Sequence, residues 1–230
     1  MIRVTRYLMI GMTMLMMGAA QEAAPQKSKG ATFSIMPLEK LGGDTLYYLY
    51  GREMTALEFR YKKRSVNLPV RLGAPLKLYV KDASSESKFP YKLVAQSGDI
   101  TNRRTLVFIK KSKQGAELPY AMQTMDDDLA RFPQGSFRYI NMTKVPLVVE
   151  CGGVKSSIGA YSDTVARPKI PESAGSMPII IRTKDGMQVL GGQTYGIPTD
   201  RKMIIIRPNE KKKSPISLLN ISQPVHEGMF

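Results

Sequence analysis

The sequence predicts an all-β protein with two tandem immunoglobulin-like β-sandwich domains after an N-terminal signal peptide. Short runs of alternating apolar and polar residues recur at a spacing of about 8–12 residues, as in sandwiches and barrels. Glycine, proline and small polar residues separate these runs, and no long stretch shows the 3.6-residue period of a helix. We therefore expect one sandwich at residues 31–128 and a second at residues 129–230.

The first twenty residues have the features of an export signal. Arg3 and Arg6 provide a basic start, and an apolar run extends from Leu8 to Met17. Gly18-Ala19-Ala20 supplies the small residues of a cleavage site, which we place near Gln21. The apolar run is shorter than the roughly 20 residues of a membrane span. A retained, uncleaved anchor is the alternative.

Cleavage after residue 20 would leave a polar segment, residues 21–30, that we expect to be a flexible leader. The mature chain is then predicted to be exported, to the periplasm or cell envelope or as a secreted protein, and not to be transmembrane. Its remaining 210 residues, 20 fewer than the 230 of the whole chain, are enough for one large core or two small ones.

In the first domain, each expected strand is an alternating run that turn residues close. Thr32–Met36 ends at Pro37, as an edge strand would, and Ala56–Tyr61 puts its apolar side chains on one face. Gly42-Gly43-Asp44, Gly51 and Ser97-Gly98-Asp99 supply turns. The expected strands are Thr32–Met36, Thr45–Tyr50, Ala56–Tyr61, Leu68–Leu72, Leu76–Val80, Tyr91–Ala95, Thr105–Ile109 and Leu118–Met125.

The second domain follows a short acidic segment, Asp126–Phe132, that resembles a single helical turn stopped by Pro133. Asp185-Gly186 predicts a hairpin, and the very apolar run Met203–Arg207 predicts a central strand. The expected strands are Phe137–Met142, Leu147–Glu150, Ser157–Tyr161, Thr164–Ala166, Pro178–Arg182, Met187–Leu190, Met203–Arg207 and Ile216–Ile221. The first two, from Pro133 to Gly153, are interpreted as a hairpin-like unit that ends at two turn glycines.

The sequence offers little for catalysis or metal binding. His226 is the only histidine and Cys151 the only cysteine, so a histidine triad, a histidine-ligated zinc site and a soft-metal cluster are improbable. Asp126-Asp127-Asp128 lacks the spacing of a calcium loop and is interpreted as a solvated, capping run. No phosphate loop or dinucleotide fingerprint follows any expected strand. We therefore predict a protein that is not an enzyme and has no cofactor and no metal.

The cysteine and two sequons leave alternatives. Cys151 is expected to be a half-buried thiol at a strand end, with an intermolecular disulfide as the other possibility. Asn141-Met142-Thr143 and Asn220-Ile221-Ser222 match glycosylation sequons, but bacterial export suits a secreted chain without bridges, and we interpret both matches as chance.

The formal charge of +15 is spread over several groups of lysine and arginine. These groups form a candidate anion-binding surface for anionic glycans or envelope phosphates. The alternative, which we favour, is that they are solvated loop residues that keep the protein soluble. Export argues against nucleic acid as the natural partner. The candidate residues are Arg60, Lys62, Lys63, Arg64, Arg103, Arg104, Lys110, Lys111, Lys211, Lys212 and Lys213.

The segment Phe132-Pro133-Gln134-Gly135-Ser136-Phe137-Arg138-Tyr139-Ile140-Asn141-Met142-Thr143 resembles a motif, F-P-x-G-S-[FY]-R-[FY]-[IL]-N-[LM]-[ST], of small exported proteins from Verrucomicrobia and related bacteria. The resemblance continues into Pro146–Val149 and is weaker in the first half. That family has no assigned activity. The resemblance implies a signal peptide, β-sandwich domains and no catalytic residues to carry over.

These observations predict a non-enzymatic exported protein that acts by binding or has a structural role, with another envelope protein or an anionic envelope surface as its partner. The alternative is a periplasmic chaperone or assembly factor that works by β-strand addition, by analogy with two-domain pilus chaperones. A hydrolase is a third hypothesis, which the scarcity of acid–base groups disfavours.

Overall fold

The structure, a computed structural model, describes residues 30–84, 87–209 and 214–224. Within these residues it is all-β, with sixteen strands in four sheets of four, which confirms the predicted class. The described part contains no helix, and so none long and apolar enough to cross a bilayer. The predicted signal peptide lies outside the described residues, as do all of the leader except Gly30, His226 and Lys211–Lys213.

The first eight strands form two sheets, with the orders β3-β2-β5-β6 (sheet 1) and β4-β1-β7-β8 (sheet 2). β1 is parallel to β7, and the other neighbours are antiparallel. Their bounds are β1 Thr32–Pro37, β2 Leu46–Tyr50, β3 Glu53–Ala56, β4 Leu68–Pro69, β5 Pro75–Lys81, β6 Tyr91–Asp99, β7 Arg104–Lys111 and β8 Tyr120–Asp126.

The last eight strands repeat this topology. Their sheets have the orders β12-β9-β15-β16 (sheet 3) and β11-β10-β13-β14 (sheet 4), so adding eight to each strand number of the first half gives the second. The parallel pair β1–β7 becomes β9–β15. The bounds are β9 Phe137–Asn141, β10 Leu147–Cys151, β11 Val154–Ile158, β12 Asp163–Ala166, β13 Gly175–Thr183, β14 Gln188–Gly196, β15 Asp200–Pro208 and β16 Ile216–Pro224. The predicted boundary after residue 128 falls in the connection between β8 and β9.

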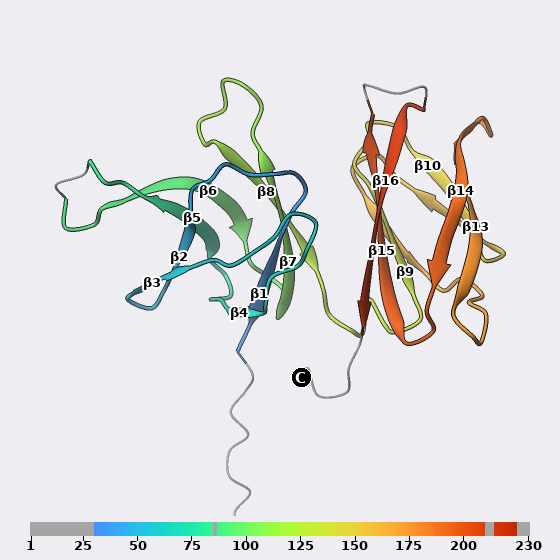
Figure 1. Cartoon of the computed structure of the whole chain (residues 1–230), viewed down its shortest axis with the longest axis horizontal. Coiled ribbons are helices and arrows are strands. Elements are labelled where there is room, and N and C mark those ends of the chain that lie inside the picture. The colour runs from blue at the N-terminus through green and yellow to red at the C-terminus, as the bar shows by residue number, and fades with distance from the viewer. Residues whose placement is uncertain (1–29, 85–86, 210–213, 225–230) are drawn as a thin grey trace, which may run out of the picture.

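The four sheets stack as successive layers with three apolar cores between them (Figure 1). One core fills the first sandwich and another fills the second. The third joins the two halves, because sheet 2 packs on sheet 3 through Met36, Leu106 and Phe108 on one side and Met203 and Ile205 on the other. We call this third core the interdomain core.

The interdomain core explains why the centre of β15 carries four consecutive apolar residues, Met203–Ile206. Met203 and Ile205 enter the interdomain core, whereas Ile204 and Ile206 enter the core of the second sandwich. A strand between two layers has no solvent face and therefore has no polar alternation. The predicted central position of Met203–Arg207 is confirmed, since β15 lies between β9 and β16.

The hairpin interpretation of Pro133–Gly153 is wrong. β9 belongs to sheet 3 and β10 to sheet 4, so the chain crosses between sheets there. The hairpin is β10–β11, closed by Gly152 and Gly153 with φ of 54° and 74°. Two consecutive positive φ values match the tight turns that favour the twist of a hairpin. Because Gly152 also lies against Pro168, where a Cβ would come within 2.7 Å, no other residue fits this turn easily.

Several other boundaries also differ from the prediction. The strand expected at Ala56–Tyr61 is wrong. Gly51 (φ 65°) and Arg52 turn the chain into β3 directly after β2, so β3 begins at Glu53 and ends at Ala56. The expected edge strand at Thr32–Met36 is central, between β4 and β7. The sequence of Gly191-Gly192 is typical of a turn, yet both residues continue β14. The hairpin predicted at Asp185-Gly186 joins β13 to β14, as expected.

Candidate functional site

The structure brings four of the predicted basic residues onto one cleft between the two halves. Lys62, Lys63 and Arg64 precede β4, Arg104 begins β7, and Arg201 of β15 joins them from the second half. The others lie elsewhere: Arg60 is in an adjacent hollow, Arg103 precedes β7, and Lys110 and Lys111 are at the opposite end of β7. We call the cleft between the two halves, with its five lysine and arginine residues, the basic cleft.

The segment that carries three of these cations is fixed to β1. The amide of Ser65 donates to the carbonyl of Ile35 over 2.9 Å, and the amide of Ile35 donates to Ser65 Oγ over 2.9 Å. Lys62 has a φ of 59°, and its amide donates to the carbonyl of Pro37 over 3.1 Å. The left-handed conformation of Lys62 makes a sharp bend, so the cationic side chains leave the sheet edge next to the junction.

A buried ionic cluster forms the floor beside the cleft. Asp127, whose side chain is 1% exposed, bridges Arg64 of the first half and Arg201 of the second. The Arg201–Asp127 distance is 3.0 Å, and Arg201 also lies 4.9 Å from the centroid of the Phe132 ring. Burial lowers the pKa of Arg201, and the charge of Asp127 opposes that shift. The interpretation of Asp127 as a solvated, capping acid is therefore wrong.

The turn in the acidic segment is shorter than the expected Asp126–Phe132, because it begins at Asp128. It closes in a single hydrogen-bonded turn, in which the amides of Arg131 and Phe132 donate to the carbonyl of Asp128. Asp128 Oδ1 caps this turn by accepting from the amide of Ala130 over 3.0 Å. After this turn the chain continues into β9. Asp127 lies between the last strand of the first half and the first strand of the second.

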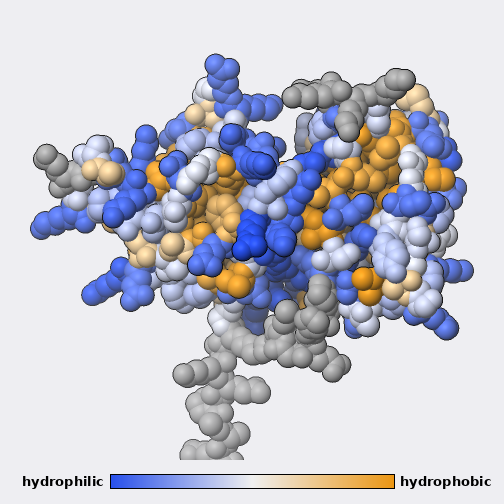
Figure 2. Space-filling view, viewed as in Figure 1, coloured by the Kyte–Doolittle hydropathy of each residue, from blue (hydrophilic) through white to orange (hydrophobic). Residues whose placement is uncertain are grey.

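The basic cleft has a volume of about 620 Å³, and none of the described residues that line it is acidic. Asp127, behind the cleft, offsets one of these positive charges. Figure 2 shows hydrophilic side chains gathered over the junction of the two halves. The lining residues are Lys62, Lys63, Arg64, Ser65, Val66, Asn67, Arg104, Arg201, Ile221, Ser222 and Gln223.

The internal repeat supplies a comparison groove on the other side of the junction, between β8 and β12. This groove, of about 460 Å³, is lined by two acids and two arginines that pair with each other. Arg138 Nε lies 2.7 Å from Asp163 Oδ2, and Arg131 Nε lies 3.3 Å from Asp126 Oδ2. The repeated fold therefore does not require a positive groove. The charge of the basic cleft is a specific property of that one side.

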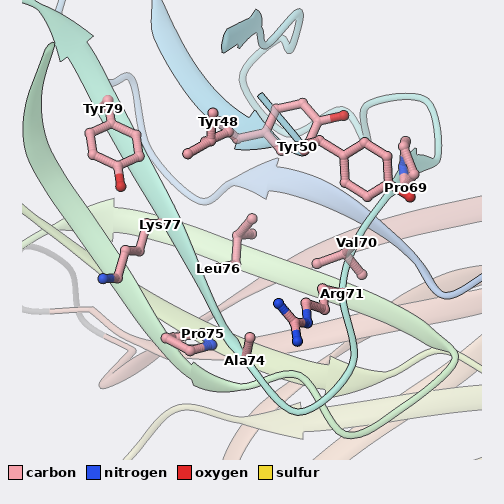
Figure 3. Close-up of a pocket in the computed structure, with 12 residues that line it drawn as sticks. Tyr48, Tyr50, Pro69, Val70, Arg71, Ala74, Pro75, Leu76, Lys77 and Tyr79 are labelled. Atoms are coloured by element: carbon pink, nitrogen blue, oxygen red, sulfur yellow. The ribbon is translucent and has the colours of Figure 1, made fainter. Parts of the chain in front are cut away.

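A larger hollow, of about 810 Å³, lies within the first sandwich where β2 and β5 diverge beyond the pair Tyr48–Leu78. Tyrosine, proline and aliphatic side chains from both strands and from the segment after β4 surround it, with Arg71 and Lys77 as its cations (Figure 3). Of the tyrosines that line it, Tyr48 is buried and Tyr50 is 47% exposed. This hollow lies in one half and has fewer charges than the basic cleft.

Cys151 is 1% exposed in the core of the second sandwich, so the expectation of a half-buried thiol is wrong. Burial raises the pKa of the Cys151 thiol. Lys202 is also buried, its pKa is lowered by burial, and its Nζ donates to the carbonyl of Tyr195. A protonated, inaccessible thiol is a poor nucleophile and cannot reach another chain.

We therefore expect Cys151 to resist alkylation in the folded protein. Incubation with iodoacetamide at neutral pH should leave the intact mass unchanged over hours, because the thiol is protonated and enclosed. The same incubation in denaturing urea should add one carbamidomethyl group. Equal rates in both conditions would show that the thiol is accessible.

No model of a known protein family matches this sequence, and neither does any curated protein. The resemblance to exported proteins of Verrucomicrobia stays a prediction. The motif that carries it has structural roles here. Asn141 Nδ2 donates to the carbonyls of Val145 and Gly159, each over 2.8 Å, and its Oδ1 accepts from Thr143. This buried amide is unavailable for modification in the folded chain.

Sequence reasoning missed Arg201 and Asp127. A signal for Arg201 exists, because Arg104–Lys110 and Arg201–Arg207 share the pattern R-x-[LM]-[VI]-[FI]-I-[KR]. The registers place Arg104 beside Asp127, whose amide donates to its carbonyl, and Arg201 opposite Gln223. The two arginines therefore occupy equivalent positions in the repeat. Their convergence could not be inferred without knowing that sheet 2 packs on sheet 3.

Proposed function

We propose that this chain is an exported, non-enzymatic binding protein that holds an anionic group of its ligand in the basic cleft. The observation that carries the proposal is the convergence of five cations from both halves on one cleft, with no acid among the described residues that line it. Phosphate, sulfate and carboxylate groups of an envelope polymer or of an envelope protein have the required charge.

The environment of the cleft strengthens its attraction for an anion. Arg201 is 5% exposed and Arg64 is 17% exposed, so both guanidinium groups are partly removed from solvent screening. Asp127 neutralises only one of these charges. An anion at the mouth of the cleft would meet the exposed Lys62 and Lys63 first and the buried arginines behind them.

The test uses inorganic polyphosphate as the probe and a double variant, Lys62→Asn with Lys63→Gln. Asparagine is suited to the left-handed backbone of Lys62, so the change removes charge without straining the bend. We expect calorimetric titration at low salt to show binding to the unmodified protein and a loss of affinity of about tenfold or more in the variant, at roughly one kcal/mol per charge contact.

Lys110→Gln with Lys111→Gln is the matched control. It removes the same formal charge at the opposite end of β7, six and seven residues beyond Arg104, which is about 20–23 Å along the strand. The control should change affinity by less than about twofold, since screening limits its effect at that distance. Equal losses in the two double variants would mean that the overall charge binds polyphosphate and would refute the basic cleft as the site.

A further inference from the structure

The second sandwich has two long edge strands on one side, and neither carries a charged residue. β14 (QVLGGQTYG) ends sheet 4 and β16 (ISLLNISQP) ends sheet 3, each over nine residues. Natural sheets usually protect such edges with charges, bulges or short strands, because an exposed edge pairs with other chains. Figure 2 shows a hydrophobic area on this part of the second sandwich, around β15 and β16.

The equivalent side of the first sandwich is closed. There β6 lies against β8, whereas β14 and β16 approach each other at few points. They meet near their starts, where Ser214 Oγ, two residues before β16, donates to the carbonyl of Val189 over 3.2 Å. Further along, Gly192, Gln193, Asn220 and Ser222 are exposed. In the described part of the second sandwich, the two edges therefore do not close against each other beyond this point.

The start of this opening is apolar, and Gly192 further along leaves space for a side chain. Leu190 and Leu218 are half-buried against the core of the second sandwich. Gly192 is paired with Ile179 and faces the same way, and a Cβ built on it meets no described atom within 4 Å. Thr194 Oγ1 is buried without a hydrogen-bond partner among the described residues. We call this feature the open edge.

The backbone of β16 is oriented to accept another strand. The amide of Asn209 donates to the carbonyl of Pro215, and in an antiparallel ladder such hydrogen-bonded pairs alternate. Starting from Pro215, the backbone hydrogen-bonding groups of every second residue therefore point toward β15. Leu218, Asn220 and Ser222 fall between them and direct their amides and carbonyls away from β15, where no described strand pairs with them.

These features select an extended polypeptide as the occupant. Free backbone groups recognise another backbone, and an apolar interior favours a strand with apolar side chains at alternate positions. The predicted leader, residues 21–30, is polar and lacks such alternation. β16 ends in the basic cleft at Ile221, Ser222 and Gln223, so the end of the occupant that lies there should be acidic.

We propose that the open edge binds a partner strand antiparallel to β16, with alternating apolar side chains preceded by acidic residues that lie in the basic cleft. Antiparallel pairing places the N-terminal end of the added strand at the C-terminal end of β16. The apolar part of the proposal is independent of the basic cleft, and the acidic part rests on the proposed function. A strand-adding assembly factor, the alternative predicted from the sequence, would act through this surface.

The probe is a labelled synthetic peptide in which two aspartates precede four Thr-Val repeats, and its binding is followed by fluorescence anisotropy. Asn220→Pro removes an outward amide and puts a ring where the added strand would lie, while the residues of β16 whose amides point toward β15 keep them. We expect its dissociation constant to rise about tenfold or more, through a lost hydrogen bond and a steric clash. Asn220→Thr keeps the amide and should bind like the unmodified protein.

Two further arms separate the parts of the proposal. A peptide with two serines in place of the aspartates should bind more weakly and should not respond to Lys62→Asn with Lys63→Gln, yet it should still lose affinity in Asn220→Pro. Equal binding by Asn220→Pro and Asn220→Thr would overturn the proposal, provided that both variants unfold at similar temperatures. Sedimentation that shows a dimer of the protein alone, dissociated by Asn220→Pro, would overturn it in favour of a second copy as the occupant.

Discussion

Replacing Asp127 with asparagine is expected to lower the free energy of unfolding by about 3–5 kcal/mol, the usual cost of removing one partner of a buried ion pair. The carboxylate is 1% exposed and neutralises Arg201, which is 5% exposed, together with Arg64. Asparagine preserves the shape but leaves two guanidinium groups facing each other in a poorly solvated site. Urea denaturation followed by circular dichroism measures the loss.

Asp126→Asn is the control for this substitution, one residue earlier in the chain. Its partner Arg131 is 77% exposed at 3.3 Å, and an exposed pair contributes at most about 1 kcal/mol. Asparagine also keeps the Oδ1 that accepts from the amide of Asp128. If Asp127→Asn destabilised the protein no more than Asp126→Asn, the ionic cluster would not hold the two halves together.

Replacing Phe108 with alanine is expected to destabilise the protein by about 3–5 kcal/mol, as for other fully buried phenylalanines. Phe108 is 1% exposed and belongs to the interdomain core, not to the interior of either sandwich. Because this core is shared, both halves should unfold together in a single calorimetric transition. Differential scanning calorimetry measures the shift in melting temperature and the number of transitions.

Met187→Ala removes a side chain that is 62% exposed and should change stability by less than about 0.5 kcal/mol. Two separate transitions in the unmodified protein would show that the halves unfold independently and that the interdomain core contributes little. In that case Phe108→Ala would move only the transition of the first half.

Strand identity was largely predictable from local pattern. The apolar run Met203–Arg207 and the turn at Asp185-Gly186 have local causes, namely burial of consecutive side chains and the left-handed conformation of Gly186. Hairpins with turns of two residues were harder. At Gly51-Arg52 a short turn looks like a break between strands. The alternation of Ala56–Tyr61 therefore predicts a strand where β3 in fact ends.

Pairing between strands was not predictable from local pattern. Phe137–Asn141 and Leu147–Cys151 are adjacent in sequence and suit a hairpin, yet they belong to different sheets. The same alternation of apolar and polar residues is compatible with two strands paired in one sheet and with a chain that crosses to the facing sheet. Both arrangements place the apolar side chains in a core. The internal repeat likewise became visible only from the strand orders, although Arg104–Lys110 and Arg201–Arg207 retain a trace of it in sequence.

By itself, the sequence determined the class of the fold and the residue types available for chemistry. A single cysteine, a single histidine and dispersed cations constrain function before any contact is known. The tertiary structure decided which of these residues meet. The basic cleft exists because sheet 2 packs on sheet 3 and brings Arg64, Arg201 and Asp127 together across many residues of sequence. Local periodicity determines which face of a strand is apolar, but only packing determines what that face contacts.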